Sequence, residues 1–152
     1  MLSAIPAFAP VSDRLSTSAL PRKEDFCTIA EAGYEAVISL AHPQDSLVLK
    51  HEGWYVVSSG MEYHHLLQDF AHPCIEDYER LRDLLKALQE RRVWLHCTKN
   101  HRVSALVFLY NVLERGVSVE EARSRLEEIW HPDARWQEMM DLCLEKYVYQ
   151  YL

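Results

Sequence analysis

The residues best suited to chemistry lie together between positions 93 and 105. The apolar run Val93–His96 leads into Cys97, and Arg102 and Ser104 follow a short polar stretch. The backbone N–H groups of such a loop, with the N-terminus of a helix behind it, can converge on an anion. The same dipoles stabilise a thiolate, so we expect a depressed pKa for Cys97 and a nucleophilic role. The guanidinium of Arg102 can hold two phosphate oxygens, and Ser104 could donate a hydrogen bond to the sulfur.

The apolar pattern places this loop in an alternating series of strands and helices. We predict strands near Arg14-Leu15 and over 35–40, 62–67 and 93–96, because each is a short apolar run between turn signals. We predict helices over 21–33, 49–59, 75–92, 118–130 and 134–149, and another that runs from the end of the 97–101 loop to 116. We also predict an irregular arm over 1–13 and loops over 42–46 and 68–74. This order indicates a single-domain α/β fold, a small and mostly parallel sheet flanked by helices. Ligands bind beyond the carboxyl ends of strands in such sheets, which points to the loops after Leu67 and His96.

Composition excludes several classes of protein. The chain has 152 residues, with 16 basic and 23 acidic side chains and a formal charge of -7, so we expect no nucleic-acid or membrane partner. Its four glycines are too far apart for a glycine-rich nucleotide loop. Four scattered cysteines form no CxxC pair, so we expect free thiols and neither metal nor cofactor. The first residues lack the basic start of a secretory signal, which favours a cytoplasmic location.

The segment from His96 to Ser104 resembles the phosphate-binding loop of cysteine-dependent protein tyrosine phosphatases, especially the small dual-specificity-like ones. It is most similar to a bacterial group of compact phosphatase-like proteins whose loop reads HCxxNxRVS. The resemblance covers residues 12–115 in the expected order, through Asp13–Ser18, Gly33–Leu40, Gly60–Tyr63 and Gln68–Phe70, with Pro73 following.

This resemblance implies phosphoester hydrolysis through a cysteinyl-phosphate, with a phosphorylated protein or a small phosphomonoester as substrate. Cys97 would attack phosphorus, while Arg102 and the loop amides hold the equatorial oxygens. A general acid on the neighbouring loop would protonate the leaving oxygen and then activate water. Asp69 is the first choice for that acid, and Asp45 is the weaker one. His96 would support the loop from beneath.

The loop departs from the common signature in its length. Four residues separate Cys97 from Arg102 instead of five, none of them is glycine, and Val103 stands where the Arg normally lies. Either the loop is one residue tighter and Arg102 still reaches the anion, or Arg102 points elsewhere and catalysis is weak or absent. Asn100 suits a tight loop because Asn tolerates left-handed backbone. The expected phosphate-binding residues are Thr98, Lys99, Asn100, His101, Arg102 and Val103.

Two other functions stay open at this point. One is a catalytically weak or inactive phosphate-binding regulatory module, and the other is a sulfurtransferase or arsenate-reductase-like enzyme, which also uses an anion-cradling cysteine loop. Lys99 and His101 either attract the substrate or are simply solvated. The oligomeric state is left open.

The remaining cysteines, histidines and tryptophans have plain structural interpretations. We expect Cys27, Cys74 and Cys143 to pack as small apolar residues, and one of His64 and His65 to lie in the core with the other on the surface. Trp130, Trp136, Tyr147 and Tyr149 are expected in the core or in an oligomer contact.

Overall fold

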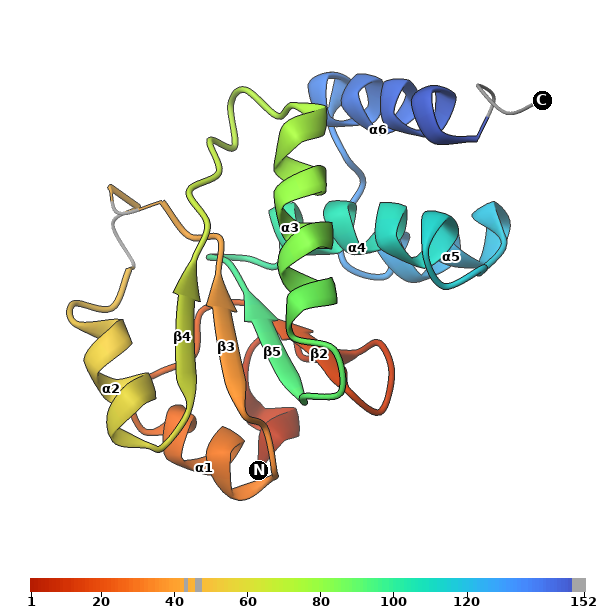
Figure 1. The fold of residues 1–152 in the computed structure, drawn as a ribbon. Helices are drawn as coiled ribbons and strands as arrows, with labels where there is room; N and C mark the ends of the chain where they lie inside the picture. Colours follow the sequence, from red (N-terminus) through yellow and green to blue (C-terminus); the bar gives the residue numbers. More distant parts are fainter. Residues whose placement is uncertain (43, 46–47, 149–152) are drawn as a thin grey trace.

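A computed structural model describes residues 1–42, 44–45 and 48–148 of the chain. The predicted α/β class is confirmed: a five-stranded sheet has the order β1-β2-β5-β3-β4, with β1 antiparallel to β2 and the other pairs parallel (Figure 1). The strands are β1 Ala9–Pro10, β2 Leu15–Ser18, β3 Ala36–Ser39, β4 Glu62–His65 and β5 Val93–His96. The helices are η1 Leu2–Ala4 (a short 3-10 turn), α1 Asp25–Glu31, α2 Glu52–Ser58, α3 Ile75–Ala87, α4 His101–Leu113, α5 Val119–Glu127 and α6 Ala134–Tyr147.

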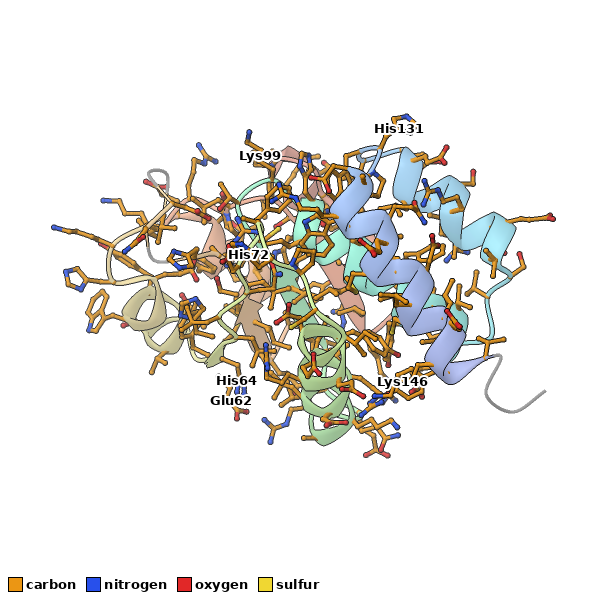
Figure 2. All side chains as sticks on the ribbon, turned by 90° about the horizontal axis from the view of Figure 1, so that it is seen from above. Glu62, His64, His72, Lys99, His131 and Lys146 are labelled. Atoms are coloured by element: carbon orange, nitrogen blue, oxygen red, sulfur yellow. The ribbon has the colours of Figure 1, made fainter. Side chains whose placement is uncertain are left out.

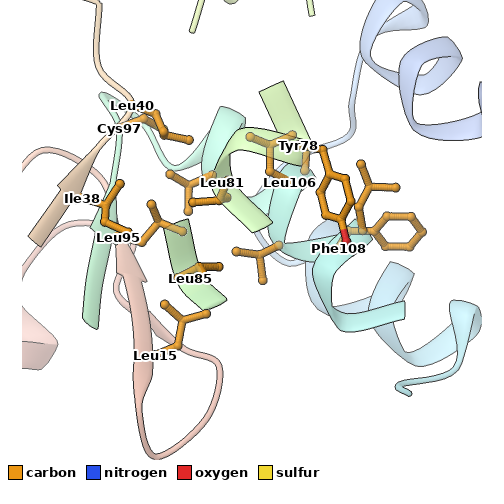
Figure 3. Close-up of a cluster of buried hydrophobic side chains, with 14 of the residues drawn as sticks. Leu15, Ile38, Leu40, Tyr78, Leu81, Leu85, Leu95, Cys97, Leu106 and Phe108 are labelled. Atoms are coloured by element: carbon orange, nitrogen blue, oxygen red, sulfur yellow. The ribbon is translucent and has the colours of Figure 1, made fainter. Parts of the chain in front are cut away.

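Both faces of the central strands are buried, and side chains alternate between them. Val37 and Trp94 pack with Phe26 of α1 on the face that α1 and α2 cover. Ile38 and Leu95 pack on the opposite face, against α3 and α4 (Figure 3). Because both faces are covered, β3 and β5 are continuous apolar runs rather than alternating ones.

Helix α4 is the central helix of the second face. Its residues from Arg102 to Leu109 are all buried, and it packs against α3, α5 and α6. Because α4 follows β5 after only four residues, the loop 97–100 is held between a buried strand and a buried helix. Both anchors fix the loop backbone at the carboxyl end of the sheet.

Several helices differ from their predicted bounds for local reasons. Helix α1 begins at Asp25 rather than Pro21, because the Asp25 carboxylate accepts a 2.8 Å hydrogen bond from the Arg22 amide and closes a turn there. Helix α2 begins only after His51, whose φ of 61° is left-handed. Helices α3 and α5 end at Ala87 and Glu127, each a few residues before the predicted end.

The N-terminal arm contains elements that the sequence did not predict, and parts of two other predicted segments lie outside the described residues. The irregular arm over 1–13 contains η1 and β1, which the apolar pattern did not predict. Pro43 and Ser46 of the predicted 42–46 loop lie outside the described residues, as does Tyr149, the predicted end of α6. No helix among the described residues has the length and apolar character needed to cross a membrane.

The cysteines and the histidine pair only partly match their predictions. Cys143 is buried as predicted, but Cys27 and Cys74 are exposed. Cys74 lies at the N-cap of α3, which explains its place outside the core. Neither His64 nor His65 is in the core, because β4 is an edge strand with half-exposed side chains. Trp136 is fully buried, in agreement with its prediction.

Candidate active site

The loop after β5 has the tight backbone that its sequence predicts. Asn100 has a φ of 65° and caps α4, which confirms the left-handed backbone expected there. Its side chain turns away from the loop, with Nδ2 donating to the carbonyl oxygen of Ala7 (2.9 Å) and to Thr17 Oγ1 (3.1 Å). Asn100 therefore ties the loop to the N-terminal arm and to β2, and only its backbone can face an anion.

A cavity of about 370 Å³ opens above this loop. It is lined by Asp45, Phe70, Cys97, Thr98, Lys99, His101 and Arg102. In Figure 2, which looks down on the carboxyl ends of the parallel strands, Lys99 lies on the rim of the molecule. A thiol, a guanidinium and an ammonium thus share one hollow, which suits a small anion. Within the described part of the chain, no group of three or more His, Cys, Asp or Glu side chains is placed to hold a metal ion.

Cys97 lies at the base of this cavity and at the edge of the core beside Leu40 (Figure 3). Its side chain is fully buried. Burial raises the pKa of the Cys97 thiol, and the backbone amides of Val103, Lys99 and Arg102 with the Arg102 charge offset that increase only in part. The expectation of a depressed pKa is therefore wrong for the free protein, because desolvation outweighs the loop dipoles.

The guanidinium of Arg102 lies in the cavity but already has partners. It donates to the carbonyl oxygen of Leu40 (3.1 Å) and to Asp45 Oδ2 (2.8 Å). The hydroxyl of Thr98 donates to the same Asp45 oxygen at 2.6 Å. Burial opposes ionisation of Asp45, but the bonds from Thr98 and Arg102 outweigh it and lower the pKa of that carboxyl. A carboxylate therefore occupies donors that a phosphate would use.

Asp69, the first choice for the general acid, is placed outside the cavity. Its carboxylate accepts the Ala71 amide (3.0 Å) and lies 2.8 Å from Nδ1 of His72. The hydrogen bonds from His72 and Ala71 lower its pKa, and its side chain is 59% exposed. The next residue, Phe70, lines the cavity, with its ring centroid 5.8 Å from the Arg102 guanidinium carbon. The Asp69 loop therefore reaches the site, while the carboxylate faces outward.

The side chains of Ser104 and His101 contact groups that the loop sequence did not predict. The hydroxyl of Ser104 donates to the carbonyl oxygen of His101 (3.1 Å) and borders a different hollow, beside Phe8. The expected hydrogen bond from Ser104 to the sulfur is therefore wrong, because the hydroxyl is engaged within α4. The His101 ring stacks on Trp130 with centroids 4.4 Å apart. Burial and the charges of Lys99 and Arg102 lower the pKa of His101.

Beneath the loop, His96 is fully buried and contacts two acceptors. Its Nδ1 lies 3.2 Å from the carbonyl oxygen of Cys97, and its Nε2 lies 3.0 Å from Oε1 of Glu52. The hydroxyl of Tyr63 donates to the other oxygen of Glu52 at 2.7 Å. Sequence reasoning missed both partners. No local sequence pattern links them to His96, because Glu52 belongs to α2 and Tyr63 to β4.

Comparisons with known proteins identify the fold. No family model matches the chain, and no curated protein matches it. A candidate phosphatase (DUF442) from Shewanella putrefaciens is 26% identical, with a TM-score of 0.86 over 96% of each chain. PTPMT1 in complex with PI(5)P is 16% identical, with a TM-score of 0.77 over 95% of this chain and 99% of that one. The core catalytic domain of the PP-IP phosphatase Siw14 from S. cerevisiae is 14% identical, with a TM-score of 0.76 over 97% and 92%.

These solved structures superpose on 95–97% of this chain. The chain therefore has the α/β fold of the cysteine-dependent phosphatases.

Proposed function

We propose that this protein is a phosphoester hydrolase that acts through a cysteinyl-phosphate on Cys97. The observation that carries the proposal is the shared cavity in which Cys97, Thr98, Lys99 and Arg102 meet at the carboxyl end of β5. A buried sulfur surrounded by loop amides and a guanidinium matches an attacking group placed beneath a phosphoryl group. The solved structures with the same fold are of phosphatases, which supports this class of reaction.

The proposed reaction has two steps, formation of the cysteinyl-phosphate and its hydrolysis. In the first, the Cys97 thiolate forms the S–P bond while the P–O bond to the leaving group breaks, and a general acid gives its proton to the departing oxygen. In the second step, the same group acts as a base and takes a proton from water. The water oxygen bonds to phosphorus while the S–P bond breaks, which returns the Cys97 thiolate and releases phosphate. Arg102 and the loop amides hold the equatorial oxygens throughout.

Asp69 remains our choice for the acid, and the loop that carries it must move its carboxylate inward. Phe70 already lines the cavity, so we propose that the backbone rotates at Asp69 and brings its carboxylate over the site. The rotation would separate the carboxylate from His72 and Ala71, whose hydrogen bonds lower its pKa in the free protein. Asp45 is in the cavity, but its pairing with Arg102 keeps it ionised, which disfavours proton donation. We assign Asp45 instead to holding Arg102 before the substrate binds.

The substrate class is a phosphomonoester presented at the cavity mouth, where Lys99 adds positive charge to an otherwise acidic protein. A phosphorylated inositol headgroup or a phosphorylated protein side chain both fit this description. PTPMT1 was solved with PI(5)P, and Siw14 is a PP-IP phosphatase, which favours the inositol class.

A second function, phosphate binding without turnover, is favoured by two observations. The pKa of Cys97 lies above its usual range, and Asp45 occupies Arg102. Both features weaken a nucleophilic site without removing its affinity for an anion.

Hydrolysis of an aryl phosphate separates these functions. For the enzyme we expect turnover that Cys97→Ser abolishes and that Asp69→Asn slows by about 10²- to 10⁴-fold, the usual contribution of a general acid. Absence of turnover in the native protein, with phosphate still protecting Cys97 from alkylation, would establish the binding module. Turnover that survives in Cys97→Ser would contradict both.

A further inference from the structure

The loop that joins β4 to α3 carries Asp69 and Phe70, and a buried amide lies at its base. In Figure 1 this loop rises above the carboxyl end of the sheet before it enters α3. Gln68, directly before Asp69, is only 2% exposed. Buried polar side chains normally have partners for their donors and acceptors, so the bonds of this amide show what it does.

The nitrogen of the Gln68 amide has two acceptors. Nε2 donates to the carbonyl oxygen of Asp69 (2.9 Å) and to Oδ2 of Asp77 (3.2 Å). A carbonyl and a carboxylate only accept, so the nitrogen must face them and the amide has one possible orientation. Its oxygen, Oε1, is then left without a hydrogen-bond partner among the described residues.

Asp77 fixes both ends of the loop. It lies in the first turn of α3, and its Oδ2 atom also accepts the Cys74 amide (3.0 Å), while Oδ1 accepts from Arg80. One carboxylate oxygen thus binds the residue before the loop, Gln68, and the residue after it, Cys74. The segment 69–73 between these two anchors can change its conformation while both of its ends stay in place.

The loop itself holds an unpaired donor. The carbonyl oxygen of Asp69 accepts from Gln68 and also from the His72 amide (3.1 Å), which closes a turn. The Phe70 N–H donates no hydrogen bond within the described part of the chain. It belongs to the same peptide group as the Asp69 carbonyl and points in the opposite direction. The Gln68 amide therefore has an unpaired acceptor, and the peptide group that it holds has an unpaired donor.

We propose that Gln68 is a positioning residue for Asp69 and stabilises both orientations of the loop: Nε2 holds the Asp69 carbonyl oxygen while the carboxylate faces outward, and Oε1 receives the Phe70 N–H when it faces inward. Rotation of the backbone at Asp69 turns the shared peptide group over, so its N–H takes the direction that its carbonyl oxygen had. The amide then turns as well, which keeps Nε2 on Asp77 and places Oε1 on the new donor. Pairing these two groups offsets the bonds that Asp69 loses when it leaves the outward state.

The other side of the loop is held by α6. The Trp136 indole donates to the carbonyl oxygen of Phe70 (2.9 Å), which belongs to the peptide group after the one that turns. The rotation is therefore confined to one peptide group between a fixed amide and a fixed indole. This inference rests on the proposed function in one respect, the assignment of Asp69 as the general acid.

Gln68→Met removes the donor and the acceptor with little change of volume, and Gln89→Met, at an exposed residue just after α3, is the matched control. In aryl phosphate hydrolysis we expect Gln68→Met to lower kcat about fivefold, the usual effect of one lost hydrogen bond, while Gln89→Met leaves kcat unchanged. The alkylation rate of Cys97 by iodoacetamide should stay at the native value in both proteins, because neither change touches the nucleophile.

A double-mutant cycle separates the positioning of Asp69 from general support of the fold. Because Gln68 acts through Asp69, adding Gln68→Met to Asp69→Asn should leave the residual kcat of Asp69→Asn unchanged. A purely structural role predicts the same loss of kcat in both backgrounds, and that result would overturn the proposal.

Solvent exchange of backbone amides, measured by NMR on the full-length protein, follows the loop without any ester. The Ala71 and His72 amides donate to Asp69 in the outward state, so in Gln68→Met they should exchange about fivefold faster. In the native protein, saturating orthovanadate, a phosphate mimic, should slow the exchange of the Phe70 amide. Gln68→Met should abolish that slowing.

Native exchange rates at Ala71 and His72 in Gln68→Met would contradict the inference, and so would a Phe70 amide that vanadate leaves unprotected. If Gln68→Met does not fold, the Phe70 amide of the native protein decides the question. A native protein that hydrolyses no ester counts against the proposed function alone, since the exchange measurements use none.

Discussion

At the scale of single residues, Asp45 decides what Arg102 can do in the free protein. Its carboxylate takes the Arg102 Nη2 donor and the Thr98 hydroxyl, both of which face the cavity. An incoming phosphate meets an occupied guanidinium and a nearby negative charge. Asp45 therefore lowers the affinity of the site for anions while it keeps Arg102 in place.

Asp45→Asn should bind inorganic phosphate about tenfold more tightly, because it removes a like charge from beside the bound anion. The inhibition constant of phosphate against aryl phosphate hydrolysis, or its protection of Cys97 from alkylation, measures this. Asp83→Asn, which changes an exposed carboxylate paired with Arg82, is the control. Weaker phosphate binding in Asp45→Asn would mean that Asp45 orients Arg102 more than it blocks it.

The pH dependence of Cys97 follows from its burial. A pKa above the usual thiol range leaves little thiolate at neutral pH, and the thiolate is the reactive form. The alkylation rate of Cys97 should therefore keep rising through the alkaline range, with no plateau near neutrality. A plateau at or below neutral pH would show that the loop dipoles outweigh desolvation, as its sequence alone suggested.

At the scale of secondary-structure elements, α6 donates two hydrogen bonds to the loop that carries Asp69. The indole of Trp136 donates to the carbonyl oxygen of Phe70 (2.9 Å), and Arg135 donates to that of Ala71 (2.8 Å). These bonds link the C-terminal helix to the loop after β4. Their partners lie more than sixty positions apart in the chain, so local sequence patterns do not predict them.

Trp136→Phe should loosen this loop and reduce kcat more than it reduces Cys97 alkylation. The change leaves the Phe70 carbonyl oxygen without its donor, which costs about 1–3 kcal/mol of stability. Urea unfolding gives the stability, and kcat beside the alkylation rate separates the loop from the nucleophile. Equal losses in kcat and in alkylation would place the effect on the whole site instead.

The elements that the sequence predicts best are those with purely local determinants. β5 matches its predicted bounds because an apolar run buried on both faces meets a polar loop at Cys97. The N-cap of α5 is likewise as predicted, with Ser118 accepting the Glu121 amide. The predicted start of α1 at Pro21 is wrong, because the turn between Arg22 and Asp25 contains no Gly or Pro that would mark it.

The candidate site also has one part that the local sequence predicts and another that only the fold brings together. Cys97 to Arg102 form one continuous segment, so their proximity could be predicted from sequence. Asp45, Phe70 and Glu52 join them only because parallel strands bring the loops after β3 and β4, and helix α2, to neighbouring places. Whether a side chain such as Asp69 or Ser104 faces the cavity depends on backbone orientation, which apolar periodicity does not encode.

At the scale of the whole molecule, the two cores share one sheet and so depend on each other. Trp94 lies in the core under α1 and α2, and Trp136 lies in the core under α3, α4 and α6. Loss of either core would expose one face of β3 and β5. The other core packs on the opposite face of the same two strands, so it would lose its support. The predicted single domain should therefore unfold as one unit.

Urea unfolding should show one transition, with tryptophan fluorescence and far-ultraviolet circular dichroism coincident. A triple Trp→Phe variant that keeps only Trp94 follows one core, and one that keeps only Trp136 follows the other. The probes should give the same midpoint within each variant. Two separated transitions in the native protein would show that the faces fold independently.

The central claim is that Cys97 forms a covalent bond to phosphorus, and rapid acid quenching during turnover of an aryl phosphate tests it most directly. Mass spectrometry of the quenched protein should find a phosphoryl group on the Cys97 peptide, increased in amount by Asp69→Asn if the slowed step is hydrolysis of the S–P bond. The adduct and the turnover should both be absent from Cys97→Ser. Turnover with the phosphoryl group on another residue, or turnover that persists in Cys97→Ser, would contradict the account.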